Sequence, residues 1–364
     1  MPSADIPQKM TALVVQDKGE AELEQIDTPN PPEGGVMVKV QNVALNPTDW
    51  KHLDWVGSKG AIVGSDFCGS IVDDCNETET GMPAGTRVAG MVRGGYQKGV
   101  GAFAEYVSTY PATLIKVPDN VPSEEAAGLG VGGFTSYCCL FQDKHLNLAA
   151  PSASLSQLPE VDSSKKILIW SGSTSVGQFA IQFARAAGYY VIVTASSKHE
   201  QYLKGLGAQE VYDYKQSDAA DKIAEKHPDL VYALDTYSIA ESQTSCARAL
   251  SKSQSSTLTT ILPPSEEVSK VNDKVKQTFF LGYTLGGQEF EFFGKSFSKE
   301  YCQEDQKFLI STVKSNVFTN YLQNKILKCN RTSPQSGGLG AVHFGFDRMR
   351  KGEVSCEKLT YQVA

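Results

Sequence analysis

A run of small polar residues, SGSTS at 171–175, is the first feature of the sequence that could carry chemistry. The apolar segment before it, 167–170, is typical of a strand buried on both faces. A helical pattern of apolar residues follows, and Gly188 is expected to end this helix in a left-handed conformation. Small residues in such a turn let the backbone approach a phosphate, whose charge the helix N-terminus attracts. Gly177 is in register with the Gly-x-Gly-x-x-Gly template of nucleotide-binding turns, whereas Thr174 stands at a glycine position. The segment predicts a nucleotide-binding unit, with an ordinary strand–helix turn as the alternative.

The residues after the next apolar strand, 189–194, indicate which nucleotide binds. A site that prefers NAD carries Asp or Glu about 20 residues beyond the glycine run, where it holds the ribose 2′-hydroxyl. This chain has Ser196, Ser197, Lys198 and His199 there. Two hydroxyls and a cation suit a 2′-phosphate, which a carboxylate would repel. The sequence thus predicts NADPH, and the alternative for Lys198 is a solvated surface lysine.

Length and charge limit the other possibilities. A chain of 364 residues exceeds the size at which single cores usually stop growing, so two domains are expected. The formal net charge of −7 argues against a nucleic-acid or anionic-membrane surface, which needs clustered Lys and Arg. No apolar run reaches a membrane span, the N-terminus lacks a signal-peptide pattern, and the eight cysteines form no Cys-x-x-Cys pair. These features predict a cytoplasmic protein with reduced thiols.

The elements around the nucleotide-binding unit fall into two groups. Strands at 10–16 and 36–45, joined through an acidic segment and a turn, and short strands up to 107 predict a small barrel or sandwich. One helix is expected over 123–141 and a surface loop over 143–164. Later strands and helices alternate as in a doubly wound parallel sheet. They are strands 208–214, 230–236 and 257–262, helices 218–227 and 240–250, a helical segment 298–324, and a C-terminal helix and strand.

This order of elements resembles the medium-chain dehydrogenase/reductase superfamily over nearly the whole chain. Four motifs are similar to its zinc-free quinone-reductase and enoyl-reductase branch: 46–51 (NPTDWK), 64–69 (GSDFCG), 101–106 (GAFAEY) and 353–359 (EVSCEKL). Together with 173–176 and the 143–164 loop, they are most similar to stand-alone enoyl reductases that act in trans with fungal polyketide synthases, and to related yeast reductases.

The resemblance implies an α/β fold, with a Rossmann doubly wound parallel sheet plus a GroES-like β-barrel domain. A GroES-like catalytic domain would span 1–127, an NADPH-binding Rossmann domain 128–317, and a return to the catalytic domain 318–364. Zinc-dependent relatives carry Gly-His-Glu where this chain has Gly64, Ser65 and Asp66, and a four-cysteine lobe where 90–102 hold no cysteine. Both zinc sites are expected to be absent, which favours reduction of a conjugated C=C bond over alcohol dehydrogenation.

The same resemblance assigns the chemistry to a few side chains. Thr48, Asp49, Trp50 and Lys51 would lie beside the cofactor, where the Lys51 ammonium could donate to a ribose or enolate oxygen. The alternative for Lys51 is an ordinary exposed lysine after a turn. Asp49 could have a catalytic role in which it orients Lys51, but a helix-capping role explains this residue equally well. Tyr137 would be catalytic or, alternatively, a packing residue.

The remaining positions are implied by the resemblance alone. Further cofactor contacts would come from Ser173, Thr174, Ser175 and Val176 at the pyrophosphate, Ser196, Ser197, Lys198, His199 and Tyr214 at the 2′-phosphate, Ile261 and Leu262 at the nicotinamide, and Glu357 and Lys358. The substrate would meet Thr135, Ser136, Tyr137, Gly282, Tyr283, Thr284, Leu285 and Gly286. Ser171 and Cys356 depart from the family, because glycine is usual at both positions.

The implied function is NADPH-dependent reduction of the C=C bond of an α,β-unsaturated thioester. The substrate would be a small molecule or carried on an acyl carrier, with a polyketide synthase as the partner in trans and without nucleic acid or membrane. A free-standing quinone or enone reductase is one alternative. A nucleotide-binding module without catalysis, as in crystallin-like proteins, is another.

Overall fold

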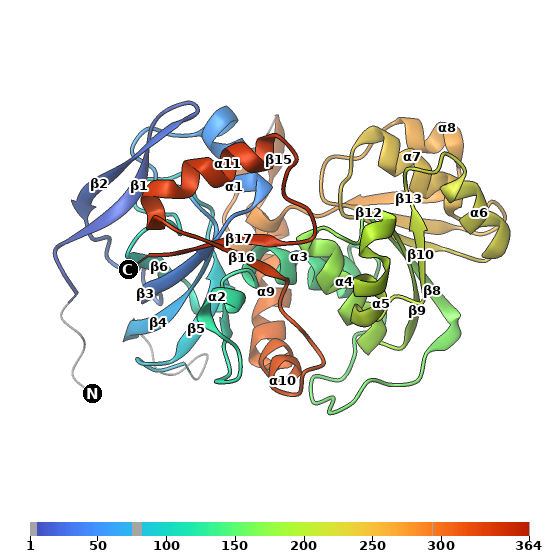
Figure 1. Cartoon of the computed structure of the whole chain (residues 1–364), viewed down its shortest axis with the longest axis horizontal. Helices are drawn as coiled ribbons and strands as arrows, with labels where there is room; N and C mark the ends of the chain where they lie inside the picture. The colour runs from blue at the N-terminus through green and yellow to red at the C-terminus, as the bar shows by residue number, and fades with distance from the viewer. Residues whose placement is uncertain (1–5, 75–81, 293, 364) are drawn as a thin grey trace. The chain divides into compact units, whose positions relative to one another are not determined.

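The computed structural model describes residues 6–74, 82–292 and 294–363, so Cys75 lies outside the described residues (Figure 1). The chain forms two compact units: unit 1 is Met1–Val131, Tyr283–Gln323 and Cys329–Ala364, and unit 2 is Gly132–Gly282 and Asn324–Lys328. The sequence-based boundaries instead grouped 283–317 with the Rossmann domain. The difference arises because helix α9 (Lys299–Lys314) contacts the turn Pro111–Thr113 of unit 1, a pairing that the helical pattern alone does not reveal.

A seven-stranded sheet forms the centre of unit 1, with the order β16-β17-β3-β4-β5-β7 and β6 paired to β3. Its strands are β3 (Val36–Ala44), β4 (Asp66–Asp74), β5 (Arg87–Met91), β6 (Tyr106–Thr109), β7 (Leu114–Lys116), β16 (Thr332–Gln335) and β17 (Lys358–Gln362). The C-terminal β17 is antiparallel to β3 and parallel to β16. Residues from both ends of the chain thus build one sheet.

A separate hairpin in unit 1 corrects the expectation for the acidic segment. β1 (Lys9–Asp17) pairs with β2 (Glu20–Asp27) in antiparallel register, although the sequence predicted only a connection there. The β2 side chains are all exposed or half-buried, so no apolar alternation marked it as a strand. The smaller elements of unit 1 are α1 (Pro47–Lys51), the π-helical turn His52–Val56, α2 (Ser123–Ala126), β14 (Phe290–Phe292), β15 (Lys295–Phe297), α10 (Val317–Gln323) and α11 (Val342–Arg350).

Unit 2 holds the parallel sheet that the sequence predicted. Its order is β10-β9-β8-β11-β12-β13, and the chain runs outward from β8 on one side and from β11 on the other. The strands are β8 (Asp162–Trp170), β9 (Tyr189–Ala195), β10 (Glu210–Asp213), β11 (Tyr232–Asp235), β12 (Ser256–Thr260) and β13 (Val275–Phe279). The helices are α3 (Gly130–Phe141, which starts in unit 1), α4 (Ser175–Ala186), α5 (Glu200–Leu206), α6 (Ala219–Lys226), α7 (Ala240–Ala249) and α8 (Glu267–Val271).

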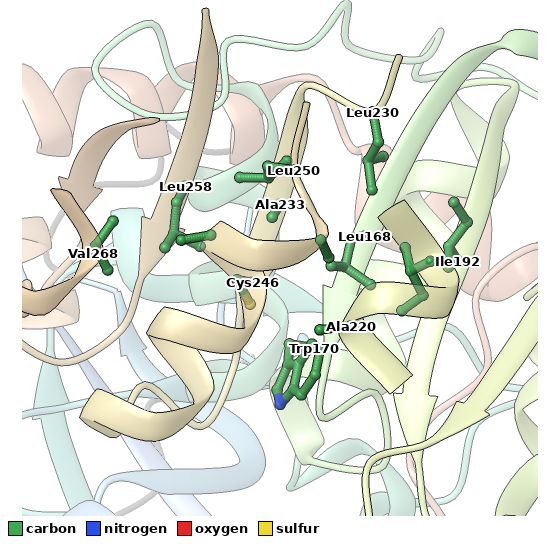
Figure 2. Close-up of a cluster of buried hydrophobic side chains, with 13 residues drawn as sticks. Leu168, Trp170, Ile192, Ala220, Leu230, Ala233, Cys246, Leu250, Leu258 and Val268 are labelled. Carbon is green, nitrogen blue, oxygen red and sulfur yellow. The ribbon is translucent and has the colours of Figure 1, made fainter. Parts of the chain in front are cut away.

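The core of unit 2 explains why its strands read as continuous apolar runs. Helices α6, α7 and α8 cover one face of the sheet through a buried cluster, and α4 contacts β8 and β9. Figure 2 shows the cluster, with Leu168, Trp170, Ile192, Ala233 and Leu258 from the strands and Ala220, Cys246 and Val268 from the helices. Strands covered on both faces need no polar alternation.

Two local predictions meet different outcomes. Gly188 has φ +83°, which confirms the left-handed end predicted for α4. The single helix expected over 123–141 is wrong, since α2 ends at Ala126 and α3 begins only at Gly130. At Gly130 a Cβ would lie 2.4 Å from the Gly90 carbonyl oxygen, so a close backbone contact occupies the break. Within the described ranges, no helix has the length and apolar character needed to cross a membrane.

Candidate functional site

The carboxyl ends of the parallel strands in unit 2 gather most of the predicted cofactor residues at one edge of the sheet. The segment 171–174 follows β8, 196–199 follow β9, Tyr214 follows β10, and Ile261 with Leu262 follow β12. Ligands of open α/β sheets bind outside this edge, at the point where the strand order reverses. In this sheet the reversal lies between β8 and β11.

The turn between β8 and α4 is fixed by hydroxyl groups. Thr174 caps α4, because its Oγ1 accepts the Gly177 N–H at 2.9 Å and donates to Thr236 Oγ1 at 2.8 Å. Thr236 in turn donates to the carbonyls of Trp170 and Ser171, both at 2.9 Å. At Gly177 a Cβ would lie 2.7 Å from the Gly172 Cα, so this position of the template requires glycine. At position 174 a threonine replaces the template glycine, and its side chain caps the helix.

The turn after β9 has a carboxylate neighbour that the sequence reasoning missed. Ser197 and Lys198 are exposed, and the Ser197 N–H donates to Asp213 Oδ2 at 3.3 Å. Asp213 ends β10, and a hydrogen bond from the Lys215 N–H, followed by those from Ser197, lowers the pKa of its carboxyl. Because β10 is parallel to β9, the ends of both strands lie together. A search of the residues after β9 alone therefore missed a carboxylate that would oppose a 2′-phosphate at this turn.

The predicted substrate residues on α3 are enclosed. Tyr137 makes edge-to-face contacts with Phe141 and Phe183, at centroid distances of 4.7 and 5.2 Å, and burial raises its pKa to about 12. Ser136 donates to the Gly133 carbonyl at 2.8 Å, within its own helix, and Thr135 is buried. These contacts agree with the packing alternative for Tyr137.

In unit 1, Asp49 closes the first turn of α1. Its Oδ2 accepts the Asn46 N–H at 2.7 Å, and its Oδ1 accepts the Ser65 hydroxyl at 2.7 Å. Burial raises the pKa of Asp49 to about 7 in spite of these hydrogen bonds. These contacts agree with the capping alternative for Asp49, and no hydrogen bond or ion pair in the described part of the chain joins Asp49 to Lys51.

Lys358 lies in the same buried network and not at an exposed position. Its ammonium donates to Asn46 Oδ1 and lies 3.1 Å from Asp66 Oδ2. Asp66 also accepts from Asn46 Nδ2 at 2.8 Å and from the Val131 N–H at 2.6 Å. The predicted neighbour Glu357 is half-buried, 3.6 Å from Arg348. Lys358 thus compensates buried carboxylates.

Lys51 has aromatic neighbours. Its ammonium lies 5.6 Å from the Trp50 ring centroid and 5.8 Å from that of Trp55, and burial lowers its pKa. Among residues 6–74, 82–292 and 294–363 it has no carboxylate partner. The Trp50 Nε1 is buried there without a hydrogen-bond acceptor.

A hydrogen-bond chain connects α1 to Tyr283. The His52 Nδ1 lies 2.8 Å from the Gly94 carbonyl, which can only accept, so Nδ1 carries the proton. Burial lowers the pKa of His52 to about 4, so Nε2 is an acceptor at neutral pH, and the Tyr283 hydroxyl donates to it at 2.6 Å. Thr48 Oγ1 then donates to the Tyr283 oxygen. Two predicted residues, Thr48 and Tyr283, are thereby brought together.

The other predicted residues lie in mixed surroundings. Thr284 and Leu285 are buried, and Gly286 has space for a Cβ. Among the side chains the structure describes, no cluster of three or more His, Cys, Asp or Glu is placed to hold a metal ion. His52 and Arg93, which the sequence reasoning missed, contact the predicted Tyr283, and His52 directly follows the 46–51 motif, a signal that could have found it.

Two known protein families match separate parts of this chain. The family described as "Alcohol dehydrogenase GroES-like domain" matches residues 32–119, and the one described as "Zinc-binding dehydrogenase" matches 175–295. A protein of the alcohol dehydrogenase superfamily from Novosphingobium aromaticivorans has a similar structure, with a TM-score of 0.75 and 19% identity over 98% of this chain and 100% of that one. The CurK enoyl reductase gives a TM-score of 0.70 at 16% identity, over 98% and 100%. The fold is thus that of the medium-chain dehydrogenase/reductase superfamily, and the predicted fold class is confirmed.

Relatives that match the full length of the chain identify its family within this superfamily. A trans-enoyl reductase of Trichoderma harzianum is 33% identical over 99% of this chain and 98% of its own, and one of Aspergillus niger is 34% identical over the whole of both. The chain therefore belongs to the trans-enoyl reductase family of these fungal proteins. It is an oxidoreductase, and the family resemblance drawn from its motifs is confirmed.

Proposed function

We propose that this chain reduces the C=C bond of an α,β-unsaturated thioester with NADPH and acts in trans with a polyketide synthase. The observation that carries the proposal is the full-length similarity to trans-enoyl reductases. The unit 2 edge supports a dinucleotide, and the cluster around Thr48 and Lys51 in unit 1 supplies polar groups for a reacting carbonyl. The GroES-like part would hold the catalytic side chains, and the Rossmann part the cofactor.

The residues of unit 2 fit a dinucleotide. The glycines at 172 and 177 leave no room for a Cβ, which lets the backbone of 173–176 approach a pyrophosphate at the start of α4. Ser197 and Lys198 would meet the 2′-phosphate, opposed by Asp213. Bound NADPH would supply a hydride to the substrate.

The residues of unit 1 would act on the substrate oxygen. As charge develops there, the Lys51 ammonium, which has no carboxylate partner among the described residues, can donate to it or to the ribose. Ser65 and Asp66, where zinc-dependent relatives carry ligands, are engaged with Asp49, Asn46 and Lys358. Their engagement supports a reaction without zinc.

Cofactor oxidation tests the proposal. The protein is mixed with NADPH and crotonyl-pantetheine, with NADPH and a benzoquinone, and with NADH in place of NADPH, while the nicotinamide absorbance is followed. We expect turnover of the thioester with NADPH, and faster turnover when the crotonyl group is on an acyl carrier protein. Quinone turnover alone would indicate a free-standing quinone reductase, and turnover of neither substrate would contradict reduction altogether.

A further inference from the structure

A cage of aromatic rings in unit 1 surrounds a guanidinium group. Arg93, two residues after β5, has its Cζ 3.6 Å from the ring centroid of Tyr96, 4.4 Å from that of Tyr283 and 4.7 Å from that of Phe290. Phe292 lies further out, at 5.9 Å. The rings come from the loop after β5, from the turn that contains Tyr283 and from β14 itself, so residues far apart in sequence enclose one cation.

The cation has no anionic partner in the described part of the chain. Its Nε and Nη2 are buried without a hydrogen bond, and no carboxylate of a described residue lies within 4.0 Å of it. These two nitrogens share one edge of the guanidinium, where two parallel N–H bonds can be made to oxygen. Arg93 as a whole is half-buried, so part of its side chain stays accessible. A ring face attracts a cation but does not satisfy its N–H groups.

The groups around Arg93 are neutral. His52 and Tyr283 both interact with Arg93, and their pKa values of about 4 and about 12 keep both uncharged at neutral pH. Asp49 is bonded to Asn46 and Ser65 instead. A half-buried cation that lacks both an acceptor and a counter-charge costs stability. Such a group is preorganised for a negative charge that forms only during a reaction.

The position of the cage decides which negative charge it fits. Tyr283 touches the guanidinium and accepts a hydrogen bond from Thr48, so Arg93 is one side chain away from the α1 residues. A phosphate at the far end of a pantetheine arm would lie much further from a reacting thioester than the single side chain that separates Arg93 from the α1 residues. The oxygen of the reacting carbonyl is the group that can lie this close.

We propose that Arg93 is a catalytic residue that donates hydrogen bonds to the enolate oxygen of the substrate, an inference that rests on the proposed function. A hydride adds to the β-carbon and forms a C–H bond, the C=C electron pair moves to the bond between the α-carbon and the carbonyl carbon, and the C=O pair moves to oxygen. The nicotinamide is left oxidised. Arg93 stabilises the oxygen charge until the carbonyl re-forms and the α-carbon takes a proton from water.

An enolate that forms without any hydride gives a direct test. Acetoacetyl-pantetheine ionises to an enolate with near-ultraviolet absorbance, so its ionisation can be followed on the protein in the absence of cofactor. We expect the wild-type protein to raise the enolate fraction of the bound compound, and Arg93→Met to abolish this rise. Arg93→Lys, which keeps the charge without the fork, should retain part of it. Equal enolate fractions on wild type and Arg93→Met, or no binding to wild type, would overturn the inference.

Kinetics separate this inference from the proposed function. With crotonyl-pantetheine and NADPH, we expect Arg93→Met to lower kcat about 100-fold while KM and the NADPH Kd change little. Arg87→Met is the matched control, because this half-buried arginine of unit 1 is bonded to the Val121 carbonyl and Ser123. If wild type turns over and Arg93→Met matches it, the inference fails and the function stands. If wild type stabilises the enolate through Arg93 but reduces nothing, the proposed function fails, and only the contact of Arg93 with an enolate oxygen stands.

Discussion

Two lysines of unit 1 carry the same charge in opposite surroundings. Lys358 is buried against Asp66 and Asn46, whereas Lys51 lies over two indole rings with no carboxylate partner among the described residues. A buried pair mainly compensates its own desolvation, so Lys358 is explained by the interior of unit 1. Lys51 has no such explanation, which makes it the stronger candidate for a contact with substrate or cofactor.

Replacement of Lys51 by Met should therefore reduce activity more than stability. We expect kcat with crotonyl-pantetheine to fall by about 100-fold, because a positioned donor is lost while no ion pair within the described residues is broken. The unfolding temperature should stay close to that of the wild type. Lys59→Met, at an exposed lysine of the same region, is the control. A kcat within threefold of the wild type would exclude a catalytic role for Lys51.

The charge of Asp213 gives a second test at this scale. Since its carboxylate accepts the Ser197 N–H beside the proposed 2′-phosphate position, Asp213→Asn should tighten NADPH binding several-fold and leave NADH binding nearly unchanged. Fluorescence titration with both nucleotides measures the two Kd values at low salt, where the effect is largest. Asp221→Asn, at an exposed carboxylate of unit 2, controls for net charge. An equal change for NADH and NADPH would place the 2′-phosphate elsewhere.

At the scale of elements, the turn between β8 and α4 shows how a family position tolerates a departure from glycine. Ser171 has φ +63° and Cys356 has φ +61°, so both non-glycine residues adopt the left-handed backbone that glycine favours. A side chain in this region costs roughly 1–2 kcal/mol. The hydrogen bond from the Ser171 N–H to Thr194 Oγ1, at 3.0 Å, helps to hold the turn in place.

A pair of substitutions at Ser171 isolates this backbone cost. Ser171→Ala removes the hydroxyl but keeps the Cβ, while Ser171→Gly removes both. We expect the Gly variant to be more stable than the Ala variant by about 1 kcal/mol, after the greater freedom of glycine in the unfolded chain is included. Urea unfolding of the two variants measures the difference. An Ala variant as stable as the Gly variant would show that the turn stores no strain.

The elements also show what the sequence could predict. Strands β8, β9 and β11 were predicted because covered strands read as apolar runs, and the α4 end followed from Gly188. The strand β2 was missed because its side chains stay at the surface on both faces. The cage around Arg93 could not be predicted, since its rings come from segments about 190 residues apart whose pairing no periodicity encodes.

At the scale of the whole molecule, the chain places the strand ends proposed to bind the nucleotide in one unit and the Thr48 to His52 network in the other. The three tryptophans divide in the same way, with Trp50 and Trp55 in unit 1 and Trp170 in the unit 2 core. Fluorescence in a Trp170→Phe background therefore reports the unfolding of unit 1 alone. Such a separate signal is needed because a chain of two units need not unfold in one step.

With this signal, the burial of neutral His52 predicts a pH dependence for unit 1. Burial lowers its pKa from 6.5 to about 4, so between these values the unfolded chain binds a proton that the folded chain does not. Stability is then lost as the pH falls. Relative to His52→Gln, whose amide can bond both Gly94 and Tyr283, the wild type should lose on the order of 3 kcal/mol between pH 7.5 and pH 4. Urea unfolding at both pH values, in the Trp170→Phe background, measures the loss.

The comparison with His52→Gln cancels the other groups that titrate in this range, such as Asp49, whose raised pKa acts in the opposite direction. The folded Asp49 holds its proton up to about pH 7, so its contribution falls as the pH rises from 3.8 and is common to both proteins. His343→Gln, at an exposed histidine of α11, is the control and should not reproduce the pH-dependent difference. If the stability difference between wild type and His52→Gln is the same at both pH values, His52 is not held neutral, and the direction of the hydrogen bonds from Thr48 through Tyr283 would have to be reversed.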